Sequence, residues 1–354
     1  MKIVLGMSGG VDSAVAAYLL QEAGHQVYGV TLHMTDAAPP DIDGARATAD
    51  RLQIPHTVVD CRESFRNRIE AQFAYAYQIG ETPNPCVICN REVKLAALQN
   101  YAAEHGCDAI ATGHYARIAM DAQGNRILLR GTDPQKDQSY MLYRITQKQL
   151  SQIVLPLGDL TKDVIRRIAA EQQLLPSIPH DSMDICFIPS GDYAEYLRNQ
   201  HGFVSTKGLF LAKDGQKLGT HTGQWQFTVG QRKGLGLACG TPVYVLEKDA
   251  SSNAVTVGAH EDLFASRCRI RDCSWLTLPN PHTQYTAKIR YSRGESAAWM
   301  EAFDGKTAVL QFTEPQRAMS KGQSAVIYAG EQVIGGGLID AILPDSAEGG
   351  IGMP

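Results

Sequence analysis

Two cysteines three residues apart, Cys86 and Cys89, are placed in the sequence for thiol chemistry. They follow two prolines in the segment Thr-Pro-Asn-Pro-Cys-Val-Ile-Cys-Asn, and a helix is predicted just after them, over residues 92–104. The positive end of a helix dipole stabilises a thiolate, so thiols at this place can act as nucleophiles, redox partners or metal ligands. The chain has only eight cysteines in 354 residues, too few for a disulfide scaffold.

A third thiol, Cys186, lies much later, in the apolar run Ile-Cys-Phe-Ile. On its own this run predicts a buried, inert cysteine, and only a partner thiol would change that interpretation. A zinc site made from Cys86 and Cys89 with Cys268 and Cys273 is a weaker alternative. The two pairs fall in different predicted domains, and the second spacing is uncommon in structural zinc sites.

The first thirteen residues predict a strand, a glycine turn and a helix in succession. The apolar run Ile-Val-Leu at residues 3–5 is followed by Ser-Gly-Gly-Val-Asp-Ser at residues 8–13 and then by a strong helix former. This order points backbone amides and the helix dipole at an anion, and Asp12 could hold a magnesium ion bound to phosphates. The turn lacks the glycine-lysine-serine order of the kinase-type phosphate loop. It resembles instead the loop of the ATP pyrophosphatases, which cleave ATP between the α and β phosphates and adenylate a substrate oxygen.

Strands and helices alternate through the first 190 residues, which predicts a parallel sheet covered on both faces. Ligands of such sheets bind at the carboxyl ends of the strands. Met34 follows a predicted strand and would lie either near an adenine or in the core. His114 follows another predicted strand, at residues 109–112. The prolines before Cys86 predict an extended loop that presents the two thiols.

Short strands and glycine turns replace the helices from about residue 191. Residues 191–265 predict a small linking domain of short strands and turns, which include residues 227–236. Residues 266–342 alternate in twos and predict a C-terminal antiparallel β-barrel, and residues 343–354 predict a flexible tail. Cations and aromatic rings alternate on this barrel, which suits RNA phosphates and unstacked bases, although an ordinary solvated face has the same composition. These residues are Arg290, Tyr291, Arg293, Arg317, Lys321 and Tyr328.

The composition, 44% hydrophobic and 20% charged residues, is typical of a soluble globular protein. No apolar stretch approaches the length of a membrane span, and the N-terminus lacks the pattern of a signal peptide, so a cytoplasmic location is expected. The net charge of -4 gives no general attraction to nucleic acid. Any contact with RNA must therefore use a local basic patch.

Six motifs occur in a fixed order along nearly the whole chain, at residues 6–13, 84–90, 111–115, 136–140, 181–188 and 230–236. Together they closely resemble those of the bacterial tRNA-specific 2-thiouridylases. That family replaces O2 of the wobble uridine by sulfur in tRNAs for lysine, glutamate and glutamine, using ATP and a persulfide. The resemblance implies an ATP pyrophosphatase-type (adenine nucleotide α-hydrolase-like) α/β fold for residues 1–190 and a tRNA-contacting barrel.

The resemblance also implies a role for each matching residue. It makes Cys186 the persulfide carrier and Cys89 its catalytic partner, and the two would end the reaction as a disulfide. It assigns the target base to Asn84, Pro85 and Cys86. The nucleotide would be bound by Gly6, Met7, Ser8, Gly9, Gly10, Val11, Asp12, Ser13, Met34 and Gly113. The tRNA would be contacted by His114, Lys136, Asp137, Gln138, Arg290, Tyr291 and Gln323.

The expected chemistry follows from the substrate. Uracil O2 is a very poor leaving group, so adenylation with ATP and Mg²⁺ must precede displacement by sulfur. Cys89 then either attacks a persulfide on Cys186 to free hydrosulfide or resolves the product as a disulfide. A persulfide-donating cysteine desulfurase or sulfur carrier protein and a cytoplasmic reductant are the expected partners. Because a stacked base hides C2, the base must be splayed out of the anticodon loop.

Alternatives remain at this stage. Members of the family carry aspartate or cysteine at the place of Cys86, and with cysteine the obvious acid–base role of an aspartate is lost. Cys86, Cys89 and Cys186 could instead bind a [4Fe–4S] cluster with one open iron. A different enzyme class would keep the adenylation step and use ammonia or an amine as the nucleophile, as in synthetases and amidotransferases with the same loop. A non-catalytic tRNA-binding protein with ATP as a structural ligand is the third class.

Overall fold

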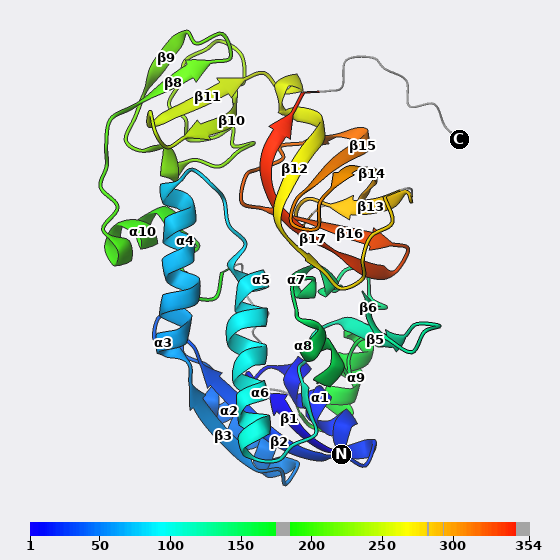
Figure 1. The fold of residues 1–354 in the computed structure, drawn as a ribbon. Helices are drawn as coiled ribbons and strands as arrows, with labels where there is room; N and C mark the ends of the chain where they lie inside the picture. The colour runs from blue at the N-terminus through cyan, green and yellow to red at the C-terminus, as the bar shows by residue number, and fades with distance from the viewer. Residues whose placement is uncertain (175–184, 282, 293, 345–354) are drawn as a thin grey trace.

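The N-terminal part of the chain forms a parallel sheet, as predicted. The structure is a computed structural model that describes residues 1–174, 185–281, 283–292 and 294–344. Its first sheet has five strands in the order β3-β2-β1-β4-β7, and every pair in it runs parallel. These strands are β1 (Lys2–Gly6), β2 (Gln26–His33), β3 (His56–Asp60), β4 (Ala109–Ala111) and β7 (Ile153–Val154). Figure 1 shows β1, β2 and β3 together in the N-terminal part of the chain.

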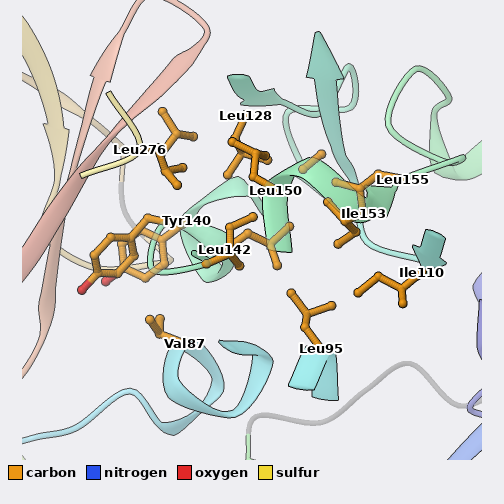
Figure 2. Close-up of a cluster of buried hydrophobic side chains, with 14 of the residues drawn as sticks. Val87, Leu95, Ile110, Leu128, Tyr140, Leu142, Leu150, Ile153, Leu155 and Leu276 are labelled. Atoms are coloured by element: carbon orange, nitrogen blue, oxygen red, sulfur yellow. The ribbon is translucent and has the colours of Figure 1, made fainter. Parts of the chain in front are cut away.

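Helices cover both faces of this sheet, which explains the uninterrupted apolar runs of its strands. On one face Ile3 and Leu5 pack against α1 (Val11–Glu22), α2 (Ile42–Arg51) and α9 (Lys162–Glu171). On the other face Val4 and Ile110 pack with Leu95 of α6 (Leu95–Glu104), and side chains from the rest of the chain complete this cluster (Figure 2). No helix in the described ranges has the length and apolar character needed to cross a membrane.

The prediction of an extended loop around Cys86 is wrong. The two thiols lie inside a helix that starts with α5 (Pro85–Cys89) and continues through the π-helical turn η2 (Asn90–Lys94) into α6. Pro85 occupies the first helical position, where its missing N–H costs nothing. The Asn84 side chain caps the helix by accepting a hydrogen bond from the Cys86 amide at 3.2 Å. An earlier helical run with a similar break consists of α3 (Arg62–Phe65), η1 (Arg66–Glu70) and α4 (Ala71–Gln78).

The middle part of the chain contains one helix and a small sheet. The sheet has the order β10-β11-β8-β9. Of the segments expected to form strands and turns, residues 227–236 contain turns and no strand, with left-handed backbone at Gly230, Gly234 and Gly236. The elements are α10 (Tyr193–His201), β8 (Gly208–Ala212), β9 (Lys217–His221), η3 (Gln224–Gln226), β10 (Tyr244–Asp249), β11 (Ala254–Gly258) and η4 (Glu261–Leu263).

The C-terminal part forms the predicted antiparallel barrel. Its strands follow the order β12-β15-β14-β13-β16-β17, and a further pairing between β12 and β17 closes it. They are β12 (Phe264–Trp275), β13 (Tyr285–Lys288), β14 (Ser296–Phe303), β15 (Ala308–Arg317), β16 (Ser324–Ala329) and β17 (Gln332–Leu343). A hairpin of the first 190 residues, β5 (Ala116–Met120) with β6 (Arg126–Arg130), extends this sheet through the pair Leu129 and Gln332. No periodic pattern in the sequence predicts that addition.

Two buried tyrosines fix the barrel to the N-terminal part. They lie in and just after α7 (Ser139–Leu142), which precedes α8 (Gln147–Gln152). The Tyr140 hydroxyl donates to the Ser324 carbonyl at 2.9 Å, and the Tyr143 hydroxyl donates to the Ser324 hydroxyl at 3.1 Å. Both rings are fully buried in the cluster that also contains Val4 of β1. The barrel and the parallel sheet therefore share one core.

Replacing Tyr143 by Phe should lower the free energy of unfolding by about 1–2 kcal/mol, because the buried Ser324 hydroxyl loses its partner. Tyr75→Phe is the matched control, since that side chain is exposed, and it should change stability by less than about 0.5 kcal/mol. Urea unfolding of the three proteins measures both values. Equal stability of Tyr143→Phe and the wild type would contradict the proposed anchoring.

Candidate nucleotide and thiol site

A cavity of about 320 Å³ opens at the carboxyl ends of β1, β2 and β4. This is the edge at which a parallel α/β sheet binds its ligands. The cavity brings together most of the residues expected to bind nucleotide and three residues given other roles. Its lining includes Gly6, Met7, Ser8, Asp12, Ser13, Met34, Gly113, His114, Gln138 and Cys186.

The turn between β1 and α1 is closed by its own side chains. The Ser13 hydroxyl accepts a hydrogen bond from the Ser8 amide at 3.2 Å and donates to the Gly10 carbonyl at 2.9 Å. Gly9 has a positive φ of 82°, and a Cβ there would lie 2.5 Å from the Asp41 carbonyl oxygen, so only glycine fits. Gly10 is the N-cap of α1, which leaves the first amides of the helix free to bind a phosphate.

Gly113 lets the end of β4 approach this phosphate turn closely. A Cβ on Gly113 would lie 3.3 Å from backbone atoms of Asp12 and Ser13. The Gln138 side chain accepts a hydrogen bond from the Tyr115 amide at 3.1 Å. This bond holds the segment before α7 against the cavity. Met34 and Gly113 line the cavity, as a nucleotide-binding role requires, whereas Gly9, Gly10 and Val11, the first residue of α1, are not part of its lining.

Asp12 is paired with a lysine that the sequence analysis missed. The Lys162 ammonium donates to both carboxylate oxygens, at 2.7 and 2.9 Å, and the Tyr115 hydroxyl donates to one of them at 2.6 Å. Lys162 is buried and lies at the first position of α9, where the helix dipole disfavours a cation. The sequence signal that points to this pair is a lysine at the first position of a helix, where a cation is unfavourable.

The three thiols gather beside this cavity. Cys89 is buried, and its sulfur lies 3.9 Å from the Met34 sulfur, whereas Cys186 lies on an accessible wall of the cavity rather than in the core. Burial raises the pKa of Cys89 to about 12, and desolvation also raises the pKa of Cys86 and of Cys186. The Lys94 ammonium opposes this rise at every one of the three thiols. Each thiol is thus protonated at neutral pH unless a substrate or a charge changes its surroundings.

The described residues contain no ready-made site for a single metal ion. Within residues 1–174, 185–281, 283–292 and 294–344, no three His, Cys, Asp or Glu side chains are placed to share a metal ion. Cys268, the first member of the second pair in the zinc alternative, is fully buried in the barrel core. The iron–sulfur alternative, in which Cys86, Cys89 and Cys186 would each bind a different iron, stays a prediction. We derive no step through such a cluster or through a zinc ion.

The residues assigned to the target base lie where the barrel meets α5. Gln323, between β15 and β16, donates to the Thr82 carbonyl at 2.8 Å and so fixes the segment that leads into Asn84. Tyr291 is half-buried, packs against Tyr140 with ring centroids 5.9 Å apart, and is near enough to Cys86 to interact electrostatically. Asn84 and Cys86 at the helix start and Tyr291 from the barrel thus border one region.

Several residues that the resemblance assigns to tRNA contact form hydrogen bonds with backbone groups around this region. The Asp137 carboxylate is buried and accepts hydrogen bonds from the Gly131 and Ser139 amides, both at 3.0 Å. Arg290 donates to the Ala318 carbonyl at 3.0 Å. Lys136 is half-buried and is better placed to reach a ligand. Contacts of these residues with tRNA remain predictions. The first four residues of the motif at 181–188 lie outside the described residues.

His114 is held as a neutral imidazole. Its Nδ1 lies 2.7 Å from the Thr112 hydroxyl, and burial, assisted by the Lys94 charge, lowers its pKa to about 3. It lines the cavity, so it can offer a hydrogen bond but no charge near neutral pH. The position is also compatible with a nucleotide contact, in addition to the tRNA contact expected from the sequence.

The fold and the site define a nucleotide-binding α/β protein with a thiol centre at its phosphate-binding edge. Comparisons with known proteins agree with this class. Residues 1–190 match the family described as "tRNA methyl transferase HUP domain", and residues 195–259 and 265–339 match its PRC-barrel and aminomethyltransferase β-barrel companions.

The most similar relatives give the family a more specific name. The chain is 44% identical to the tRNA-specific 2-thiouridylase MnmA of Moorella thermoacetica, over 96% of this chain and 99% of the relative. It is 42% identical to that of Syntrophotalea carbinolica (95% and 98% covered) and 40% identical to that of Clostridioides difficile (97% and 99% covered). The chain belongs to the tRNA-specific 2-thiouridylase family.

The lowered pKa of His114 predicts a pH-dependent stability. The unfolded chain binds a proton at His114 near its ordinary pKa of 6.5, whereas the folded protein does so only near 3, so acidification through this window favours unfolding. Between about pH 7 and about pH 5, the wild type should lose about 1–2 kcal/mol more than His114→Gln in urea unfolding. Replacement of the exposed His105 by Gln is the control. Equal losses for wild type and His114→Gln would contradict the neutral imidazole.

Proposed function

We propose that this chain is a tRNA-uridine 2-sulfurtransferase that adenylates O2 of the wobble uridine in tRNAs for lysine, glutamate and glutamine and replaces it with sulfur. The observation that carries the proposal is the shared cavity: the phosphate turn and the Cys186 thiol line the same space. A methyl transfer, which the family description names, would need neither a phosphate turn nor paired thiols. The name of the relatives fits the residues better.

The first step is adenylation of the base. The uracil O2 attacks the α-phosphate of ATP, a new phosphorus–oxygen bond forms, and pyrophosphate leaves with the electron pair of the broken bond. The amides at the start of α1 bind the phosphates, and the Lys162 ammonium can stabilise the charge that develops on pyrophosphate. Magnesium would neutralise phosphate charge, with Asp12 as its protein ligand.

The second step replaces AMP by sulfur. In one route the terminal sulfur of a Cys186 persulfide attacks C2, AMP departs with the oxygen, and the Cys89 thiolate then attacks Cys186 Sγ to release the thiocarbonyl. In the other route Cys89 attacks Cys186 Sγ first, and the hydrosulfide that is released attacks C2. Both routes reduce the sulfane sulfur to the oxidation state of sulfide, and the two electrons come from the thiols of Cys89 and Cys186. Both leave a Cys89–Cys186 disulfide, which a dithiol reductant must reduce.

The partners and the base site follow from this chemistry. A protein persulfide, from a cysteine desulfurase or a sulfur carrier, is the donor class that can load Cys186, which is accessible where Cys89 is buried. The flipped base would lie between the start of α5 and Tyr291 of the barrel, next to Cys86. Cys86 has no proton-transfer role in either route. A cytoplasmic location, where tRNA and dithiol reductants occur, remains our expectation.

Incubation with ATP, a persulfide donor and unmodified glutamate tRNA should produce 2-thiouridine at the wobble position, detected by mass spectrometry of nucleosides. Cys89→Ser and Cys186→Ser should each lower this product by at least ~10²-fold, because either thiol is needed for turnover, while pyrophosphate release still depends on both ATP and tRNA. Cys239→Ser, in a turn of the middle region, is the matched control and should keep full activity.

The same experiment separates the competing classes. Full activity of both serine variants would favour a nitrogen nucleophile over sulfur. Binding of ATP and tRNA without any pyrophosphate would favour a non-catalytic RNA-binding protein.

Lys162→Met tests the adenylation step. Loss of its charge should lower tRNA-dependent pyrophosphate release by ~10²-fold, the usual effect of removing one preorganised electrostatic contact. Replacement of the exposed Lys148 by Met controls for a general change of charge. Pyrophosphate release within about threefold of the wild type would show that Lys162 only ties Asp12 in place.

A further inference from the structure

The π-helical turn η2 separates Cys89 from α6 and changes which side chains share a face of this helix. It spans Asn90–Lys94, directly after the second thiol. In a regular α-helix, residues five apart point about 140° away from each other. In a π-helical turn the hydrogen bonds join residues five apart, and the wider turn brings side chains at that spacing much closer to the same face. The turn therefore brings Lys94 round to the face of Cys89, a relation that the sequence spacing conceals.

Two side-chain hydrogen bonds from neighbouring elements hold this turn. The buried Asn90 side chain donates to the Met141 carbonyl of α7 at 3.1 Å. The buried Gln149 side chain of α8 donates to the Arg91 carbonyl, inside the turn, at 2.7 Å. Gln149 is itself fixed by a capping box with Thr146. The π turn is thus built into the packing of the domain.

Lys94 stands between the nucleotide cavity and the thiols. It lines the cavity together with Cys186 and His114. Its charge acts on Cys89, Cys86 and Cys186, in that order of strength, and it also disfavours the protonated form of His114. In the described part of the chain no Asp or Glu pairs with its ammonium. A cation that faces three sulfur atoms, without a carboxylate to neutralise it, is placed for anionic sulfur.

We propose that Lys94 is the cation that stabilises anionic sulfur during the transfer step, with the π turn as the device that positions it. The inference rests on the proposed function and deepens it. Both routes pass through an anion at this place: the perthiolate of Cys186 or free hydrosulfide before it attacks C2, and the Cys89 thiolate before it attacks Cys186 Sγ. An ammonium beside these sulfur atoms lowers the free energy of each anion without taking part in bond changes.

Lys94→Met keeps the aliphatic stem and removes the charge, and Lys94→Arg restores a charge. Each full-length variant is incubated with ATP, unmodified glutamate tRNA and a protein persulfide donor, and pyrophosphate and 2-thiouridine are measured in parallel. For Lys94→Met we expect pyrophosphate release within about threefold of the wild type and 2-thiouridine lowered by at least ~50-fold. Lys94→Arg should regain at least about a tenth of the wild-type thiolation, and Lys148→Met should match the wild type in both assays.

The proposal is decided by comparing how Lys94→Met changes pyrophosphate release and 2-thiouridine formation. An equal loss of pyrophosphate and 2-thiouridine in Lys94→Met would overturn it, since the lysine would then act on the nucleotide or on folding. Unchanged thiolation in Lys94→Met, or no recovery in Lys94→Arg, would overturn it as well. A wild type that makes no 2-thiouridine would overturn the proposed function itself, an outcome that is distinct from a defect confined to the variant.

Discussion

The chemistry proposed for this protein depends on one spatial constraint: the α-phosphate of a nucleotide and a sulfur atom must reach the same carbon of a base. The parallel sheet meets it by ending β1, β2 and β4 at one edge. The phosphate turn follows β1, Met34 follows β2 and Gly113 follows β4. The helix that carries Cys89 packs on the same sheet through Leu95. Phosphate binding and thiol placement are therefore two results of the same layered packing.

Two lysines supply positive charge at two places along this edge of the parallel sheet. Lys162 lies beside Asp12 at the phosphate turn, and Lys94 faces the thiols. Each occupies a place that is unfavourable on local grounds, one at the wrong end of a helix dipole and one at a π turn. Such local costs are typical of functional sites, because the surrounding packing has to compensate for them.

The sequence predicts the strand, turn and helix at residues 3–20 and the barrel pattern, because each arises from local periodicity. It also identifies the residues of the cavity through their motifs. It does not show that Cys86 and Cys89 lie inside a helix, since a proline at the first helical position reads as a break. Lys94 was missed because five-residue spacing places it on the wrong face of an α-helix. The junction of Leu129 with Gln332 depends on contacts between distant segments, which periodicity cannot reveal.

The shared core has a consequence for synthesis on the ribosome. One continuous cluster joins Val4 and Leu95 of the N-terminal sheet layer with Leu276, Tyr328 and Val333 of the barrel. A nascent chain that has completed its first 190 residues still lacks the side chains that cover Tyr140 and Leu128, so apolar surface stays open until almost the last strand has emerged. The N-terminal part and the barrel thus complete their shared core only after both have been synthesised. Recombination that exchanged the barrel for that of a distant relative would have to preserve the side chains that both parts contribute to this cluster.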